Sequence, residues 1–78
     1  IKINKSLLKN KLSIIDLVIM SKFEESKSEI RRLINGKAIK INNEIVPNEK
    51  TLIVNSYFNE NYLKLSIGKK RHIKIELI

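Results

Sequence analysis

The period of the apolar residues changes at Gly36 from that of a helix to that of a strand, and this change limits the fold more than any other feature. Before it, the apolar residues of 26–34 gather on one side of a helical wheel, and Ser26, or Ser28 two residues later, can cap the helix. After it, apolar and polar residues alternate over residues 39–42. We therefore predict a helix over 26–34, a left-handed stop at Gly36, and a strand with one buried face.

The strand after Gly36 is predicted to return in a hairpin. Asn42-Asn43 accepts positive φ angles, so a tight turn there brings residues 45–46 beside residues 39–41. Pro47 ends the returning strand because proline cannot donate a hydrogen bond to a sheet. Residues 48–61 are loop-like, except that residues 52–54 are expected to add a short strand.

A second hairpin is predicted at the end of the sequence. Apolar and polar residues alternate over 62–67 and over 72–77, and Gly68-Lys69-Lys70 separates the two runs. This pattern indicates an apolar inner face and a basic turn. His72, the single histidine, falls on the predicted solvent side, as an exposed strand residue or as a phosphate contact.

The first part of the chain predicts one more helix. Ser13 can cap a segment, 13–21, that is apolar almost all round and must therefore be covered on more than one side. Residues 1–12 show no clear period and are expected to form a linker or a short edge strand, with residues 13–78 as the domain. The expected fold class is α+β, with two short helices packed on a small, mainly antiparallel β-sheet.

The composition excludes several classes of site. A chain of 78 residues without cysteine lacks room for a nucleotide-binding fold beside a substrate domain, and it has no thiolate ligand or nucleophile. One histidine and the adjacent Glu24-Glu25 pair supply no convergent metal or catalytic set. The longest apolar run, 17–20, is too short to cross a bilayer. With no catalytic set and no glycine-rich phosphate loop, we expect no enzymatic activity and no cofactor in this chain. Because the chain begins with Ile1 and its one methionine is Met20, we expect an excised or processed piece.

The positive charge is concentrated in two segments. The chain carries 16 Lys and Arg against 8 Asp and Glu, a formal net charge of +8. A lysine bias from an AT-rich genome would spread this excess evenly, but residues 26–42 and 62–78 hold all of it and contain every arginine. Such concentration is typical of a surface that binds a polyanion, and the alternative is a solvated, lysine-rich face.

The positions of the aromatic residues indicate which kind of polyanion the chain would bind. Phe23, Tyr57 and Phe58 lie outside the basic segments, and Tyr62 stands at the edge of one, so all four are expected to cover the core rather than to stack on bases. A basic helix and a basic turn with few stacking rings suit folded A-form RNA, which is held through its backbone and shape. A membrane suits them less, because the short amphipathic helix has no Trp or Phe on its apolar stripe.

Two stretches resemble known RNA-binding families. Residues 26–44, from the capping Ser26 through the paired arginines and Gly36 to the Asn-Asn turn, resemble the alpha-L motif of the module first described in ribosomal small-subunit protein four. That module is shared among ribosomal proteins, pseudouridine synthases and heat-shock RNA binders. Residues 62–72 are similar to the closing hairpin of bacterial-type tyrosyl-tRNA synthetases. The chain departs from the motif at Ile30, where a small residue is usual, and at Lys37, where glycine or an apolar residue often follows.

The resemblance implies the C-terminal RNA-binding domain of a tyrosine–tRNA ligase. In that family the domain holds the anticodon stem and the long variable arm of the tyrosine tRNA, while a catalytic domain absent here attaches tyrosine with ATP. The resemblance assigns RNA contacts to Ser26, Lys27, Arg31, Arg32 and Lys37, and to Lys69, Lys70 and Arg71 at the second turn. Lys40 and Lys74, which lie in the same basic segments, complete the expected RNA-binding set.

The resemblance also implies a bacterial-type, cytoplasmic protein with no membrane partner. It implies a parent that is a homodimer through its catalytic part and a fragment that is monomeric alone. Two other functions stay open: an rRNA-binding module of a ribosome-associated protein or pseudouridine synthase, and a basic module that binds acidic proteins. The RNA-binding interpretation requires the basic helix and the basic turn to lie on the same side of the molecule.

Overall fold

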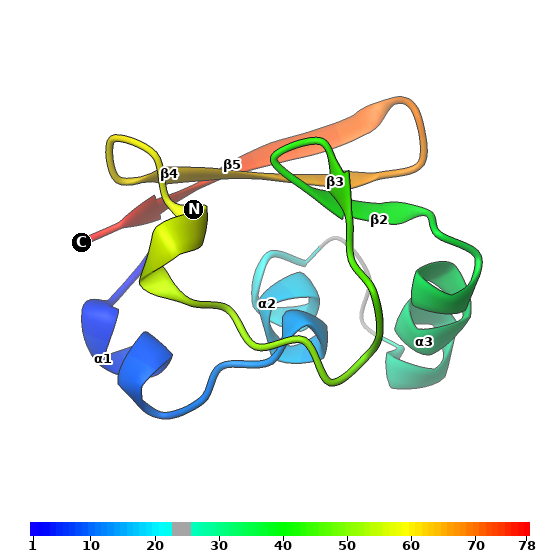
Figure 1. Ribbon diagram of the computed structural model, residues 1–78, viewed down its shortest axis with the longest axis horizontal. Helices are drawn as coiled ribbons and strands as arrows, with labels where there is room; N and C mark the ends of the chain where they lie inside the picture. The colour runs from blue at the N-terminus through cyan, green and yellow to red at the C-terminus, as the bar shows by residue number, and fades with distance from the viewer. Residues whose placement is uncertain (23–25) are drawn as a thin grey trace.

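A mixed five-stranded sheet forms one layer of the molecule, and three short α-helices cover one face of the sheet (Figure 1). The computed structural model describes residues 1–22 and 26–78. The strand order is β1-β5-β4-β2-β3, with β1 parallel to β5 and the other neighbours antiparallel. The elements are β1 (Lys2–Ile3), α1 (Lys5–Lys9), α2 (Ile14–Met20), α3 (Lys27–Asn35), β2 (Ile39–Ile41), β3 (Glu44–Ile45), the 3₁₀ turn η1 (Asn55–Tyr57), β4 (Tyr62–Ile67) and β5 (Arg71–Leu77). The predicted α+β class is confirmed, with one α-helix more than expected.

Serine caps begin the two predicted helices, as the sequence indicated. The Ser13 hydroxyl accepts a hydrogen bond from the backbone N–H of Asp16 at 3.1 Å, and the Ser26 hydroxyl accepts one from the N–H of Glu29 at 3.3 Å. Each bond satisfies an N–H group that has no partner within its helix. Four of the seven residues of α2 are buried, which confirms that this helix is covered on more than one side.

The end of α3 differs from the prediction in one residue. Gly36 has φ −83°, whereas Lys37 has φ +60° and takes the left-handed position. The N–H of Ala38 donates to the carbonyl of Leu33 at 2.9 Å, and that of Lys37 donates to the carbonyl of Ile34 at 3.0 Å. These two bonds form a Schellman motif in which Lys37, not Gly36, is the residue just beyond the cap.

Both predicted hairpins form, although the returning strand of the first, β3, covers Glu44–Ile45 and not residues 45–46. Asn42 and Asn43 have φ +52° and +72° and join Ile41 to its partner Glu44 in a two-residue turn. In the second hairpin, Leu63, Leu65, Ile67, Ile75 and Leu77 are buried against the helices, while Ile73 is half-buried. No buried polar side-chain atom of the described residues lacks a hydrogen-bond partner.

Three elements differ from the prediction. Asn4 caps the unpredicted helix α1 by accepting from the N–H of Ser6 at 3.0 Å, and Leu7 and Leu8 pack against the core. Residues 52–54 form no strand, because only Leu52 pairs, in an isolated bridge with Ser13. The short turn η1 was likewise not predicted. Phe23 and the Glu24-Glu25 pair lie outside the described residues.

Candidate nucleic-acid interface

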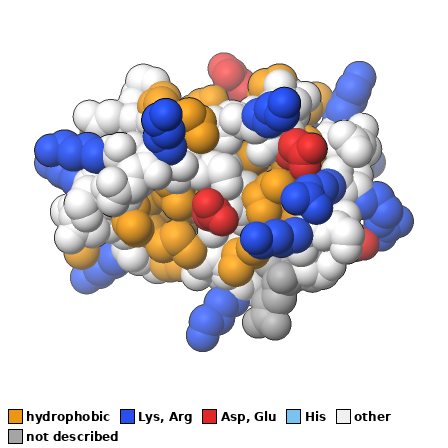
Figure 2. Space-filling view, turned by 90° about the horizontal axis from the view of Figure 1, so that it is seen from below, with side chains coloured by type: hydrophobic (Ala, Val, Ile, Leu, Met, Phe, Trp, Pro, Cys, Tyr) orange, Lys and Arg blue, Asp and Glu red, His pale blue; other side chains and the backbone are white. Residues whose placement is uncertain are grey.

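The amphipathic helix α3 presents its basic side chains to solvent. Ile30 and Ile34 are buried beneath it, whereas Lys27, Arg31 and Arg32 are exposed. Successive helical residues point about 100° apart, so the two arginines leave the helix in different directions. Figure 2, which views the helix layer, shows Lys and Arg side chains among acidic ones at the α3 end of the molecule.

Each of these arginines is paired with a carboxylate. Arg31 Nε donates to Glu49 Oε2 at 2.6 Å, and Arg32 donates to both oxygens of Glu29 one helical turn away. The hydrogen bonds from Arg32 lower the pKa of Glu29, and Glu29 in turn raises the pKa of Arg32. Both pairs are exposed, so solvent screens them and another anion can displace the carboxylates at little cost.

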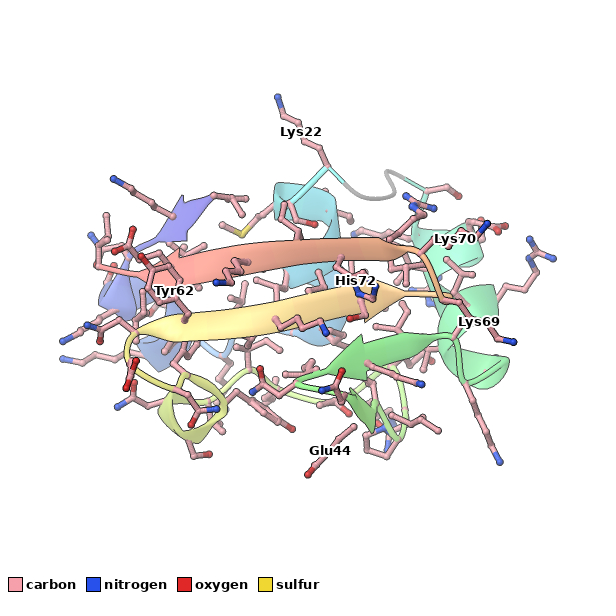
Figure 3. The ribbon with its side chains drawn as sticks, turned by 90° about the horizontal axis from the view of Figure 1, so that it is seen from above. Lys22, Glu44, Tyr62, Lys69, Lys70 and His72 are labelled. Carbon is pink, nitrogen blue, oxygen red and sulfur yellow. The ribbon has the colours of Figure 1, made fainter. Side chains whose placement is uncertain are left out.

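The end of α3 lies beside the turn between β4 and β5. The N–H of Gly68 donates to the carbonyl of Ala38 at 2.8 Å, and Ile39 pairs with Ile67 across β2 and β4. Lys37, Lys69 and Lys70 therefore lie at one end of the molecule. Figure 1 shows the β4–β5 turn above α3 at this end, and Figure 3 labels Lys69 and Lys70 there. In the part of the chain that the structure describes, none of these three lysines has a carboxylate within salt-bridge distance.

We call Lys27, Arg31, Arg32, Lys37, Lys69 and Lys70 the α3–tip surface. From Lys27 to Lys37 the helix and its cap extend roughly 15 Å at 1.5 Å per residue. Ser26 stands at the far end, where its hydroxyl contacts the N–H of Glu29 and, at 3.1 Å, the hydroxyl of Ser28. The structure thus brings Lys37 and Lys69, which are 32 residues apart in the sequence, to the same end of the molecule.

The other residues predicted to bind RNA, which are Lys40, Arg71 and Lys74, lie on different faces of the sheet. Arg71 pairs with the buried Ile67 and so projects from the face on which the helices lie. Lys40 pairs with Ser66, which pairs with His72, and these three project from the opposite face. Lys74, two residues from His72, shares that opposite face. Lys40 and Lys74 are therefore separate from the α3–tip surface.

Sequence reasoning missed the partners of the arginines. Glu29 and Arg32 are three residues apart on a helix, a spacing that signals an ion pair. Glu49 is 18 residues from Arg31, and no local pattern indicates their contact. Sequence reasoning also did not select Lys64. Lys64 pairs with Lys74 across β4 and β5, so both lysines lie on the face opposite the helices.

The described residues contain neither a metal-binding cluster nor a membrane-spanning helix. Within residues 1–22 and 26–78, no group of three His, Asp or Glu side chains could hold a metal ion. No helix in those same residues has the length and hydrophobicity that a membrane span requires.

Comparison with known proteins identifies the family. The model of the tyrosine–tRNA ligase SYY-like C-terminal domain matches residues 3–75. A tyrosine–tRNA ligase of Pelagibacter ubique is 57% identical over 77 residues, which are 99% of this chain and 19% of that protein. The tyrosine–tRNA ligase of Ehrlichia chaffeensis is 46% identical over 67 residues, 85% of this chain and 16% of that protein. That of Borrelia garinii is 41% identical over 76 residues, 97% of this chain and 19% of that protein.

The chain spans less than a fifth of the length of these relatives. The family match covers both stretches on which the resemblance depended, the α3 motif and most of the final hairpin. The chain belongs to the family of tyrosine–tRNA ligase C-terminal domains.

Proposed function

We propose that this chain is the tRNA-binding domain of a tyrosine–tRNA ligase and that the α3–tip surface holds the tRNA backbone. The family supports the partner, because the relatives are named tyrosine–tRNA ligases. The observation that carries the proposed surface is the hydrogen bond from Gly68 N–H to the Ala38 carbonyl, which joins the basic turn to the end of the basic helix.

The side chains of this surface suit phosphate groups. Lys37, Lys69 and Lys70 provide mobile point charges at one end, and each phosphate that they neutralise releases a counterion. Arg31 and Arg32 provide planar forks that can bond two oxygens at once. Phosphate then replaces Glu49 and Glu29 as the partner of these guanidinium groups. Such contacts fix position and orientation, and they read little base sequence.

We further propose that this domain and the rest of the whole protein have different roles. This domain grips the anticodon stem and the long variable arm, and the part of the protein outside this chain attaches tyrosine to the tRNA with ATP. Tethering the two parts raises the effective concentration of tRNA at the catalytic part without any new contact there. In this proposal the whole protein works in the cytoplasm as a homodimer through its catalytic part, and the isolated chain is a monomer.

The proposal predicts that removing charge at the hairpin end weakens tRNA binding. We expect the triple substitution Lys37→Gln, Lys69→Gln and Lys70→Gln to raise the dissociation constant for tyrosine tRNA at least about tenfold, and to lower the log–log salt slope by about 2–3. Fluorescence anisotropy of labelled tRNA at several salt concentrations measures both quantities.

The matched control removes the same net charge at the other end of the molecule. Lys5, Lys9 and Lys11 are exposed on and after α1, which Figure 1 shows at the end opposite α3. The control Lys5→Gln, Lys9→Gln, Lys11→Gln is expected to bind tRNA almost as the unmodified chain does. Equal losses in the two triple variants would show that only net charge matters, and would contradict the proposed surface.

A further inference from the structure

The face of the sheet opposite the helices is a second basic surface. Cross-strand register places Lys40, Lys64 and Lys74 on this face together with Tyr62 and His72, and Lys2 joins them from the edge strand β1 opposite Glu76. We call these six residues the open sheet face. Figure 3 looks down on it, with the strands in front and the helices behind. It holds four lysines against one acid, Glu76.

Among residues 1–22 and 26–78, Tyr62 is the one tyrosine or phenylalanine on this face, and its ring is exposed to a partner. Its side chain lies at the start of β4, and the residue is 44% exposed. Lys74 Nζ lies 5.7 Å from the centre of the Tyr62 ring, a cation–π distance. The sequence predicted that Tyr62 covers the core, but its ring is exposed. The strand register pairs Tyr62 with Glu76, and Lys74 lies diagonally across from it on the same face, with Lys64 two residues along β4.

A ring beside mobile ammonium groups on a flat sheet has the chemistry of a platform for unpaired nucleotides. Bases stack on aromatic rings while lysines neutralise the adjacent phosphates, and every base offers a π-face. A sheet face with stacking rings is also a known way in which proteins hold single-stranded RNA. Duplex RNA keeps its bases stacked on one another and cannot use Tyr62 in this way.

Other polyanionic partners use this face less completely. An acidic peptide would pair with the lysines and leave the exposed ring without a specific partner. On this face the exposed apolar side chain is Ile45, on the edge strand β3. A lipid surface would need more exposed apolar area than this side chain supplies. The face also continues along β4 toward Lys69 and Lys70, so one RNA molecule can reach both surfaces.

We infer that the open sheet face binds an unpaired stretch of RNA, with a base stacked on Tyr62 and phosphates on Lys40, Lys64 and Lys74. This inference rests on the proposed function and extends it, because it adds an unpaired RNA segment to the backbone held by the α3–tip surface. His72 Nδ1 and Ser66 Oγ, 2.9 Å apart, occupy the stretch between Tyr62 and the turn and add polar groups along the same path.

The test compares two RNA probes on the 78-residue chain. The probes are an oligouridylate of about twelve nucleotides, long enough to cover one binding face, and a blunt-ended RNA duplex of similar charge. Tyr62→Leu, which keeps an apolar side chain but removes the ring, should weaken oligouridylate binding about tenfold and leave duplex binding unchanged. Tyr62→Phe, which keeps the ring, should bind both probes as the unmodified chain does. Lys64→Gln with Lys74→Gln should lower the oligouridylate salt slope by about 1.4.

Several outcomes would overturn the inference. Oligouridylate binding that Tyr62→Leu leaves unchanged would do so, as would equal losses in the charge-matched control Lys5→Gln, Lys9→Gln. A polyglutamate peptide that binds as tightly as oligouridylate, with the same sensitivity to Lys64 and Lys74, would assign the face to an acidic protein instead. If Tyr62→Leu leaves oligouridylate binding unchanged while the Lys37→Gln, Lys69→Gln, Lys70→Gln variant still loses duplex binding, this inference fails and the proposed function stands. Melting curves of each variant show that the fold is retained.

Discussion

Lys37 combines a backbone cost with a charge at the place where the two basic segments meet. Its φ of +60° lies in the left-handed region, where a side chain costs about 1 kcal/mol relative to glycine. Gly36, which could adopt this conformation without cost, stands one residue earlier with φ −83°. Lys11 and Lys22, which also follow helices, have the same φ of +60°, so this conformation belongs to the end of a helix and does not by itself indicate a phosphate contact.

We predict that Lys37→Gly makes the chain more stable and a weaker RNA binder. Relief of the left-handed strain should add about 0.5–1 kcal/mol to the free energy of unfolding. Loss of one phosphate contact should lower the salt slope for tRNA by about 0.7–0.9. Lys37→Gln is the matched control, because it removes the charge and keeps the strain. Urea denaturation and tRNA anisotropy measure the two effects, and equal stability of the two variants would refute the assignment of strain.

At the scale of elements, Asn42 fastens the β2–β3 turn to the rest of the sheet. Its side-chain Nδ2 donates to the Tyr57 carbonyl at 2.6 Å, and its Oδ1 accepts from the Lys64 N–H at 3.0 Å. Its backbone N–H also donates to the Lys64 carbonyl at 2.8 Å. One residue thus connects the turn, β4 and η1.

We predict a loss of about 2–4 kcal/mol in the free energy of unfolding for Asn42→Ala, because it removes two hydrogen bonds and strains a backbone with φ +52°. Asn42→Gly should lose about 1 kcal/mol less, since glycine accepts that φ. Asn43→Gly, at φ +72°, is the control and should change stability by less than about 1 kcal/mol. Urea denaturation midpoints that are unchanged in Asn42→Ala would contradict this role.

The elements that could be predicted from the sequence are those with strong local signals. The caps at Ser13 and Ser26, the Asn42-Asn43 turn and the final hairpin each depend on a few neighbouring residues, and each forms as expected. Helix α1 was missed because five residues are too few to show a helical period.

The parts of the fold and of the site that the sequence did not predict depend on tertiary contacts. Residues 52–54 have the apolar sequence of a strand. In the structure they lie against the residues just before α2, where the N–H of Ile53 donates to the carbonyl of Leu12 at 2.8 Å. The same limit applies to the candidate site. The basic residues could be found from charge alone, whereas the pairing of Arg31 with Glu49 and the division of Lys40 and Lys74 from Lys69 depend on how distant elements pack.

At the scale of the whole molecule, one sheet separates two basic surfaces that meet at the β4–β5 turn. The α3–tip surface lies at one end of the molecule, on α3 and on the β4–β5 turn, and the open sheet face lies on the side of the strands away from the helices (Figures 1 and 3). The molecule extends only 30 × 24 × 20 Å, so one folded RNA can contact both. The domain assignment of residues 1–12 as a linker or edge region stays a prediction, although Lys2–Ile3 pairs with β5.

The central claim is that α3 and the β4–β5 turn bind one tRNA together. An NMR titration of the isotope-labelled chain with tyrosine tRNA tests it most directly, because it follows every backbone amide separately. The account predicts that amides of residues 27–37 and of residues 68–71 shift along the same saturation curve, with one dissociation constant. Shifts confined to one of these two segments, or two segments that saturate at different tRNA concentrations, would contradict it.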